Sequence, residues 1–276
     1  MLLFNYKYWH TRCIIPNESK TTLNQICKTA NDVRSDRFYI PRVCAVEKLY
    51  AQFSLEKVMS SNLHAKKATK ISLFSFNGAA MRAFHMSWLA FFVCFFAWFA
   101  CAPLMPVIAG EFHLTKDQIA NINIAAVAIT ILVRLIVGPL CDKYGPRKTY
   151  TALLVLGSIP VFGVASANSY ESFLFFRLLI GAIGASFVIT QYHTSIMFAP
   201  NVVGTANAAT AGWGNAGGGA TQVLMPLMLG ALVMFGVEQA MGWRIALIVP
   251  GVLMLIVGLM YWKFTQDCQQ GNFQEL

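Results

Sequence analysis

The chain has 276 residues, of which 57% are hydrophobic and only 12% are charged, and its formal net charge is +9. Soluble domains carry about 25% charged residues, so the composition excludes an ordinary soluble protein and indicates a membrane protein. The seven cysteines form no CxxC pair, and no His-rich ligand spacing, nucleophile elbow or phosphate loop is visible. We therefore expect no metal, no cofactor and no enzymatic activity.

The positive charge is concentrated before the first apolar segment. Residues 1–85 contain 13 Lys and Arg against 5 Asp and Glu, whereas residues 86–276 contain 8 against 7. A basic segment could bind nucleic acid or anionic lipid, but beside membrane spans the positive-inside rule favours a cytoplasmic tail. We predict such a tail over residues 1–85 and no nucleic-acid partner. Residues 1–72 resemble no family, and disorder is one interpretation of them.

Six apolar segments follow, each about the 20 residues that a helix needs to cross the hydrocarbon core. They are residues 86–109, 119–140, 149–167, 173–197, 203–235 and 243–262. The predicted fold class is therefore an all-α membrane protein, with a six-helix transmembrane bundle over residues 86–265 and a short tail over 266–276. Both termini are expected in the cytoplasm, because that orientation also places there Lys143, Arg147, Lys148 and Lys263.

Arg134 is the single charge inside the second segment. A charge near the membrane centre costs about 2.5–3.5 kcal/mol on insertion scales, so such a residue usually faces a cavity or a partner. No acidic residue lies in the interior of a predicted span. Snorkelling to the cytoplasmic surface is the alternative. If Arg134 faces a cavity instead, its planar guanidinium, with several N–H donors, suits an anionic substrate.

The loop 138–148 follows the second segment and reads GPLCDKYGPRK. Gly145 and Pro146 suit a tight turn, and Asp142 can cap or pair with a neighbouring helix end. With Gly138, Asp142, Gly145 and Arg147 at matching spacing, the loop resembles the signature between the second and third helices of the major facilitator superfamily. Segment 177–184 also resembles that superfamily's fourth-helix pattern. Asp142, Gly145 and Arg147 are then expected to act in conformational gating, and Gly181 and Gly184 in close helix packing.

Residues 211–219 read AGWGNAGGG, with five glycines in nine residues of an otherwise apolar span. Small residues let membrane helices approach closely, and Asn215 is a polar exception among them. This segment, preceded by Gln191-Tyr192, resembles the nitrate signature of the nitrate/nitrite porter family. The resemblance implies a nitrate site that contains Arg134, Asn215, Gly214 and Tyr192, although Tyr192 could equally be a packed aromatic. Helix packing is assigned to Gly212, Gly217, Gly218 and Gly219.

From about residue 74 to the end, the chain resembles the N-terminal half of algal and diatom nitrate transporters. Such transporters have twelve helices, so a second six-helix half or self-association is expected. The resemblance implies a nitrate transporter of the plasma membrane that works by alternating access, with proton symport. Alternatives are nitrite transport, nitrate/nitrite exchange, or a half-size sensor that does not transport. Membrane lipid is the remaining expected partner, and the chain is interpreted as a fragment.

Overall fold

The computed structural model describes residues 67–273. Residues 68–268 form one compact unit. Residues 1–67 and 269–276 group separately and lie almost wholly outside the described range. The predicted basic tail therefore lies outside the described residues, except for its last part.

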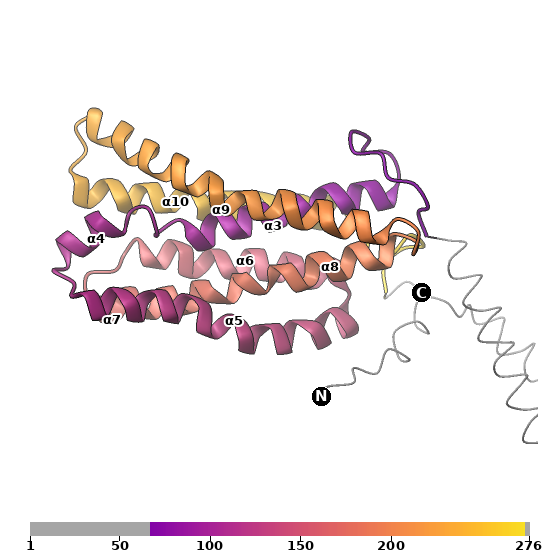
Figure 1. The fold of residues 1–276 in the computed structure, drawn as a ribbon, viewed down its shortest axis with the longest axis horizontal. Coiled ribbons are helices and arrows are strands. Elements are labelled where there is room, and N and C mark those ends of the chain that lie inside the picture. Colours follow the sequence, from indigo (N-terminus) through magenta and orange to yellow (C-terminus); the bar gives the residue numbers. More distant parts are fainter. Residues whose placement is uncertain (1–66, 274–276) are drawn as a thin grey trace, which may run out of the picture. The chain divides into compact units, whose positions relative to one another are not determined.

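The described residues are helical apart from turns, loops and isolated bridges such as that between Ala68 and Phe198. The predicted all-α class is confirmed. Figure 1 shows the helices running along one another in the compact unit. In chain order they are α3 (Ala79–Phe99), α4 (Met105–Glu111), α5 (Lys116–Tyr144), α6 (Pro146–Val164), α7 (Tyr170–Ile180), the 3₁₀ turn η1 (Gly181–Ala185), α8 (Ser186–Met197), α9 (Val203–Met234) and α10 (Gln239–Phe264).

Five helical segments among the described residues are long and apolar enough to cross a membrane: α3, α5, the continuous run from α7 to α8, α9 and α10. The third predicted span, 149–167, corresponds to α6, a helix of 19 residues. Two basic residues, Arg147 and Lys148, lie in its first turn and lower its hydropathy. Six transmembrane helices therefore stay a prediction, whereas the helical fold is shown.

The first apolar segment differs most from its predicted bounds of 86–109. Helix α3 begins seven residues earlier, after Gly78, and ends at Phe99. Turn residues 100–104 then separate it from the short helix α4. Two prolines explain the interruption: Pro103 disfavours a helical conformation at the residue before it, and Pro106 lies in the first turn of α4, where no N–H is needed.

The fourth predicted span is interrupted in its middle by η1. A 3₁₀ turn inside a longer helix often marks strain or a hinge. Here Gly181 and Gly184 supply the interruption, and both touch α5. The hydroxyl of Thr130 donates a hydrogen bond of 2.6 Å to the Gly181 carbonyl, so α5 is attached to the interruption itself.

Helix α3 lies at the centre of the unit and packs on α8, α9 and α10. Helix α10 also packs along α6, and α5 packs on α7 and η1 (Figure 1). The largest fully buried side chains include Trp243, Tyr150 and Tyr261. By contrast, α5 and α9 expose most of their apolar side chains, for example Ile131 and Leu227. Exposed apolar faces of this size are expected of helices that contact lipid or further protein.

Candidate functional site

Arg134 is positioned by a close contact between α5 and η1. Helix α5 begins with a capping box, in which the Thr115 hydroxyl accepts a hydrogen bond from the backbone N–H of Gln118. Along one face of the helix, Ala126, Thr130 and Arg134 recur at four-residue spacing. A Cβ at Gly181 would overlap the Ala126 carbonyl, so glycine permits this approach.

The Arg134 side chain emerges beside this contact. One terminal nitrogen, Nη2, lies 3.5 Å from the Gly184 carbonyl oxygen, at the limit of a hydrogen bond. The residue is exposed within the compact unit. Among the described residues, no carboxylate forms an ion pair with Arg134. The guanidinium therefore retains donors that can bind an anion.

Asn215 is positioned by a second glycine contact, between α9 and α3. A Cβ at Gly214 would overlap the Phe91 ring, and a Cβ at Gly217 would overlap the Phe92 carbonyl. These two glycines bring the backbones of α9 and α3 together. Asn215 lies between them in sequence and is exposed, and its amide makes no hydrogen bond to the described part of the chain.

A row of aromatic rings connects these two contacts. The Trp98 indole donates a hydrogen bond of 2.8 Å to the Ala126 carbonyl of α5. The Phe95 ring is 5.3 Å from the Trp98 ring, and the Phe91 ring is 4.4 Å from Phe95. Phe91 in turn contacts Gly214. The structure thus connects the α5 face of Arg134 to the α9 segment of Asn215 through side chains of α3.

Phe187 adds a ring from α8, at 5.7 Å from Phe91. It follows η1 by two residues, and it is half-buried. Sequence reasoning did not single out Phe91 or Phe187, because α3 is rich in phenylalanine throughout and nothing in the pattern distinguishes these rings. Phe91 is fully buried, so these two rings belong to the packed contacts that α3 makes with α8 and α9.

The remaining residues that the sequence assigned to the site or to helix packing differ in how closely the described residues surround them. Tyr192 is half-buried and packs against the apolar core, so its part in a substrate site stays a prediction. A Cβ at Gly218 would lie 3.3 Å from the Phe99 ring, which is tighter than an ordinary contact. At Gly212 and Gly219, a Cβ would meet no heavy atom of the described residues within 4 Å. Any packing role of those two glycines therefore needs a surface beyond the described residues.

The turn between α5 and α6 contains the predicted gating residues. Gly145 adopts φ +85°, a conformation that L residues rarely adopt. A Cβ there would also overlap the Asp267 carboxylate. Asp267 Oδ1 accepts a hydrogen bond of 2.9 Å from the Arg147 backbone N–H, at the start of α6. Asp267 thus fills the helix-end role that the sequence suggested for Asp142.

Arg147 also attaches this turn to the end of α10. Its Nε donates a hydrogen bond of 2.8 Å to the Trp262 carbonyl. Its guanidinium lies 4.4 Å from the centre of the Trp262 ring, as in a cation–π contact. The segment after α10 is held further by His193, whose Nε2 lies 2.9 Å from the Gln266 carbonyl oxygen. The turn and the residues 265–268 therefore form one packed end of the bundle.

A second arginine within a membrane-spanning segment, Arg177 of α7, is buried and has a defined partner. Arg177 Nη1 donates a hydrogen bond of 2.9 Å to the Trp98 carbonyl, near the end of α3. Only 4% of Arg177 is exposed. The two intramembrane arginines therefore differ in their environment. Arg177 donates a hydrogen bond to a carbonyl near the end of α3, whereas Arg134 is exposed.

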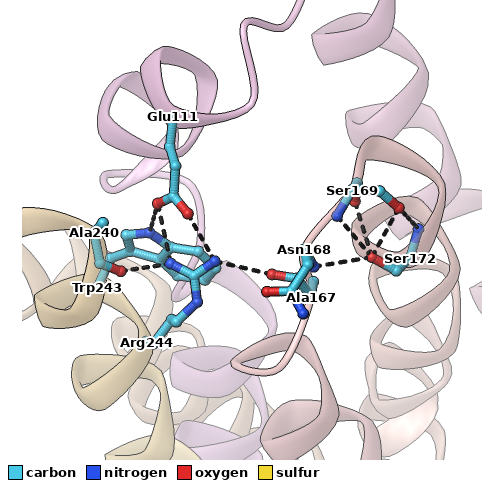
Figure 2. A network of polar contacts seen from close by, with 8 residues as sticks. All are labelled: Glu111, Ala167, Asn168, Ser169, Ser172, Ala240, Trp243 and Arg244. Carbon is cyan, nitrogen blue, oxygen red and sulfur yellow. Dashed lines mark hydrogen bonds and ion pairs between the residues drawn. The ribbon is translucent and has the colours of Figure 1, made fainter.

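At the opposite end of the bundle, Glu111, Trp243 and Arg244 form a polar cluster that we call the Glu111 clamp (Figure 2). Glu111 Oε1 lies 2.7 Å from Arg244 Nη2, and Glu111 Oε2 accepts a hydrogen bond of 2.6 Å from the Trp243 indole. Arg244 Nη2 also donates to the Ala167 carbonyl at 3.0 Å. The clamp thereby joins α4, α10 and the loop after α6.

Electrostatics stabilise the charged form of this clamp. Burial alone raises the pKa of the Glu111 carboxyl. The hydrogen bonds from Arg244 and Trp243 and the Arg244 charge outweigh burial, so the net pKa of Glu111 lies below its usual value. The guanidinium also stacks over the Trp243 ring at 4.2 Å. The two terminal nitrogens of Arg244 are thus engaged by Glu111 and by the Ala240 and Ala167 carbonyls.

These features define a polytopic helical membrane protein with two exposed polar donors beside glycine-mediated helix contacts. Residues 87–272 match the Major Facilitator Superfamily, and the chain belongs to that family. It is 40% identical over 207 residues to a protein of Arabidopsis thaliana named high affinity nitrate transporter 2.5. It is also 40% identical over 210 residues to high-affinity nitrate transporter 2.3 of Oryza sativa subsp. japonica.

A third relative is the nitrate/nitrite transporter NrtP of Nostoc punctiforme, at 35% identity over 72% of this chain and 40% of the relative. The two plant matches cover 75% and 76% of this chain. These similarities confirm the resemblance to nitrate/nitrite porters, and all three relatives are named as transporters. The chain spans about 41% of the length of the two plant relatives.

The fold is also similar to a solved structure, a bacterial homolog of the human lysosomal transporter Spinster, with a TM-score of 0.59. The match covers 70% of this chain and 44% of the other, at 14% sequence identity. At that identity the match shows the fold alone. It agrees with the arrangement of α3 to α10 described above.

Proposed function

We propose that this chain forms one half of a membrane transporter for nitrate. The observation that carries the proposal is Arg134: an exposed guanidinium in a membrane-spanning helix, without an ion-pair partner among the described residues. Such a charge is costly unless a partner compensates it. A planar oxyanion fits the donor fork of arginine bidentately.

Asn215 supports nitrate rather than a larger anion as the substrate. Its amide can donate to one anion oxygen while Arg134 binds the other two, which matches a planar anion with three oxygens. The names of the relatives support the same substrate. Nitrite shares the charge and planarity and is the alternative, as is exchange of the two anions.

The exposed faces of α5 and α9 support a site completed by further protein. Arg134 and Asn215 lie on these helices, and a Cβ at Gly212 or Gly219 would meet nothing among the described residues. A second six-helix half, or a second copy of this chain, would cover these faces. Rocking of the two halves about the site would then give alternating access.

The remaining details follow from the charge distribution and the family. We assign the protein to the plasma membrane with both termini in the cytoplasm, because the basic residues at the start of α6 and in the last turn of α10 then lie inside. Uptake is proposed to be proton-coupled. Asp142, Gly145 and Arg147 would act at the cytoplasmic end, where the turn between α5 and α6 meets the end of α10.

Uptake of labelled nitrate into proteoliposomes tests the proposal, with Arg134→Lys placed in a complete twelve-helix transporter that contains this half. Lysine keeps the charge but loses bidentate geometry. Hydrogen bonds to charged groups contribute about 1.5–3 kcal/mol, so the apparent affinity should fall roughly tenfold to hundredfold. Arg82→Lys is the control, because Arg82 is exposed at the start of α3. Unchanged kinetics in Arg134→Lys would refute the site.

One alternative is a half-size membrane sensor that binds nitrate and does not transport it. The chain as given, reconstituted alone, separates the two functions. Nitrate binding without flux would support the sensor, whereas flux would support self-association into a transporter. Absence of both binding and flux, with the fold retained, would support the requirement for a second half.

A further inference from the structure

A groove of about 680 Å³ lies on one side of the unit, between α5, α6 and η1. Its walls are apolar: Val133, Ile136 and Leu140 belong to α5, and Leu156 and Ile159 to α6. Small residues, among them Gly157 and Ala182, also line it. None of these residues belongs to the proposed nitrate site.

One end of the groove is polar. Tyr144, the last residue of α5, and Lys148, in the first turn of α6, line it there. The other charged residues of the turn, Asp142, Lys143 and Arg147, do not line the groove, and the four charges sum to +2. The groove therefore joins an apolar channel to a positively charged end.

The length of the groove matches one leaflet of a bilayer. Its lining runs from residue 133 to 144 on α5 and from 148 to 160 on α6. At 1.5 Å per residue these stretches are about 17 Å long. Half of a hydrocarbon core of about 30 Å is about 15 Å. The basic end thus lies at headgroup depth when the other end lies near the membrane midplane.

The volume of the groove favours an acyl chain over an α-helix as its occupant. A helix of about 17 Å with a diameter of about 10 Å would occupy roughly 1300 Å³, about twice the groove. A single acyl chain is thinner and flexible, and it can contact the small lining residues that a helix would not reach. Charge complementarity at Lys148 selects a negatively charged headgroup.

We propose that this groove binds a phospholipid with a net negative headgroup, one acyl chain lying between α5 and α6 and the phosphate beside Lys148 and Tyr144. Lysine supplies the charge, and the tyrosine hydroxyl supplies a hydrogen-bond donor at the interface. The lipid would connect α5 to α6 directly above the turn that contains Gly145. The site is independent of the nitrate proposal, since neither Arg134 nor Asn215 takes part.

Photocrosslinking of the full chain in phosphatidylcholine vesicles tests this site. The probe is phosphatidylglycerol with a diazirine in its acyl chain, compared with diazirine phosphatidylcholine at the same fraction. We expect crosslinks on residues 133–144 and 148–160, favouring phosphatidylglycerol about fivefold, the effect of one basic residue near an anionic lipid. Lys148→Gln should bring the two probes to equality. Lys263→Gln, at the end of α10, should keep the preference.

Ala152→Phe provides a second variant, since Ala152 lines the groove. A phenyl ring there should reduce crosslinking by both probes at an unchanged melting temperature. The proposal is overturned if α9 and α10 are labelled as strongly as the groove, or if Lys148→Gln keeps the preference. Crosslinks between two copies at Lys148, formed with a separate bifunctional amine-reactive reagent, would also overturn it, because they would show that a second copy covers this face.

Discussion

The contact between α9 and α3 yields a prediction that two substitutions on one helix can test. At Gly217 a Cβ would overlap the main-chain carbonyl of Phe92, which cannot turn aside as a side chain can. At Gly219 the same atom would meet none of the described residues within 4 Å. Gly217→Ala and Gly219→Ala each add one methyl group to the same helix. The methyl group is crowded by backbone at position 217 and has open space at position 219.

The pair isolates the packing contribution. Replacing glycine by alanine favours the helix by about 1 kcal/mol at either position, so this effect cancels between the two variants. Overpacking at Gly217 costs about 1–3 kcal/mol, and the two variants should differ by that amount. One kcal/mol corresponds to about 2–4 °C in melting temperature for a unit of 150–250 residues.

Thermal unfolding in mild detergent, followed by tryptophan fluorescence, measures the difference. We expect Gly217→Ala to melt several degrees below Gly219→Ala, with Gly219→Ala at or above the unsubstituted chain. Equal melting temperatures would show that α9 and α3 are not in backbone contact at Gly217. A lower value for Gly219→Ala would show that another surface covers that residue in the purified protein.

Two further predictions concern the ends of the bundle. Asp267→Ala removes the acceptor for the Arg147 backbone N–H and should lower stability by about 0.5–2 kcal/mol; Asp267→Asn, which keeps an acceptor oxygen, should lose less in the same melting assay. The lowered pKa of Glu111 means that its contribution to stability is complete above the unfolded pKa of about 4.3 and is lost as pH falls through the folded pKa. Glu111→Gln should therefore melt below the unsubstituted chain at pH 6, and the gap should narrow toward about pH 3; a gap that does not change with pH would contradict the ion pair with Arg244.

Local patterns predicted much of the fold because each membrane span is a local property. Length and hydropathy located α5, α9 and α10, and the glycine content of 211–219 predicted the close approach found at Gly214 and Gly217. The break after Phe99 was missed because the apolar run continues through residues 100–109, and only the two prolines signal the turn. Hydropathy is insensitive to such a turn.

Contacts between distant segments could not be predicted in the same way. Asp267 caps α6 from 120 residues away, and no spacing in the sequence relates it to Arg147. Asp142, close in sequence, was the natural candidate for a helix-end role. The rings of Phe91 and Phe187 likewise meet only when α3 and α8 pack. Arg134 was identifiable because a single charge inside an apolar segment is visible in the sequence itself.

The packed segment after α10 sets a limit on how this bundle can be shortened. Buried Thr265, Asp267 and Cys268 lie beyond the last helix, and the Gln266 carbonyl lies beside His193 of α8. A truncation placed at the helix end, after Phe264, would expose His193 and uncap α6 while leaving every span intact. The minimal autonomous unit, for expression or for fusion to a partner half, must therefore extend to Cys268.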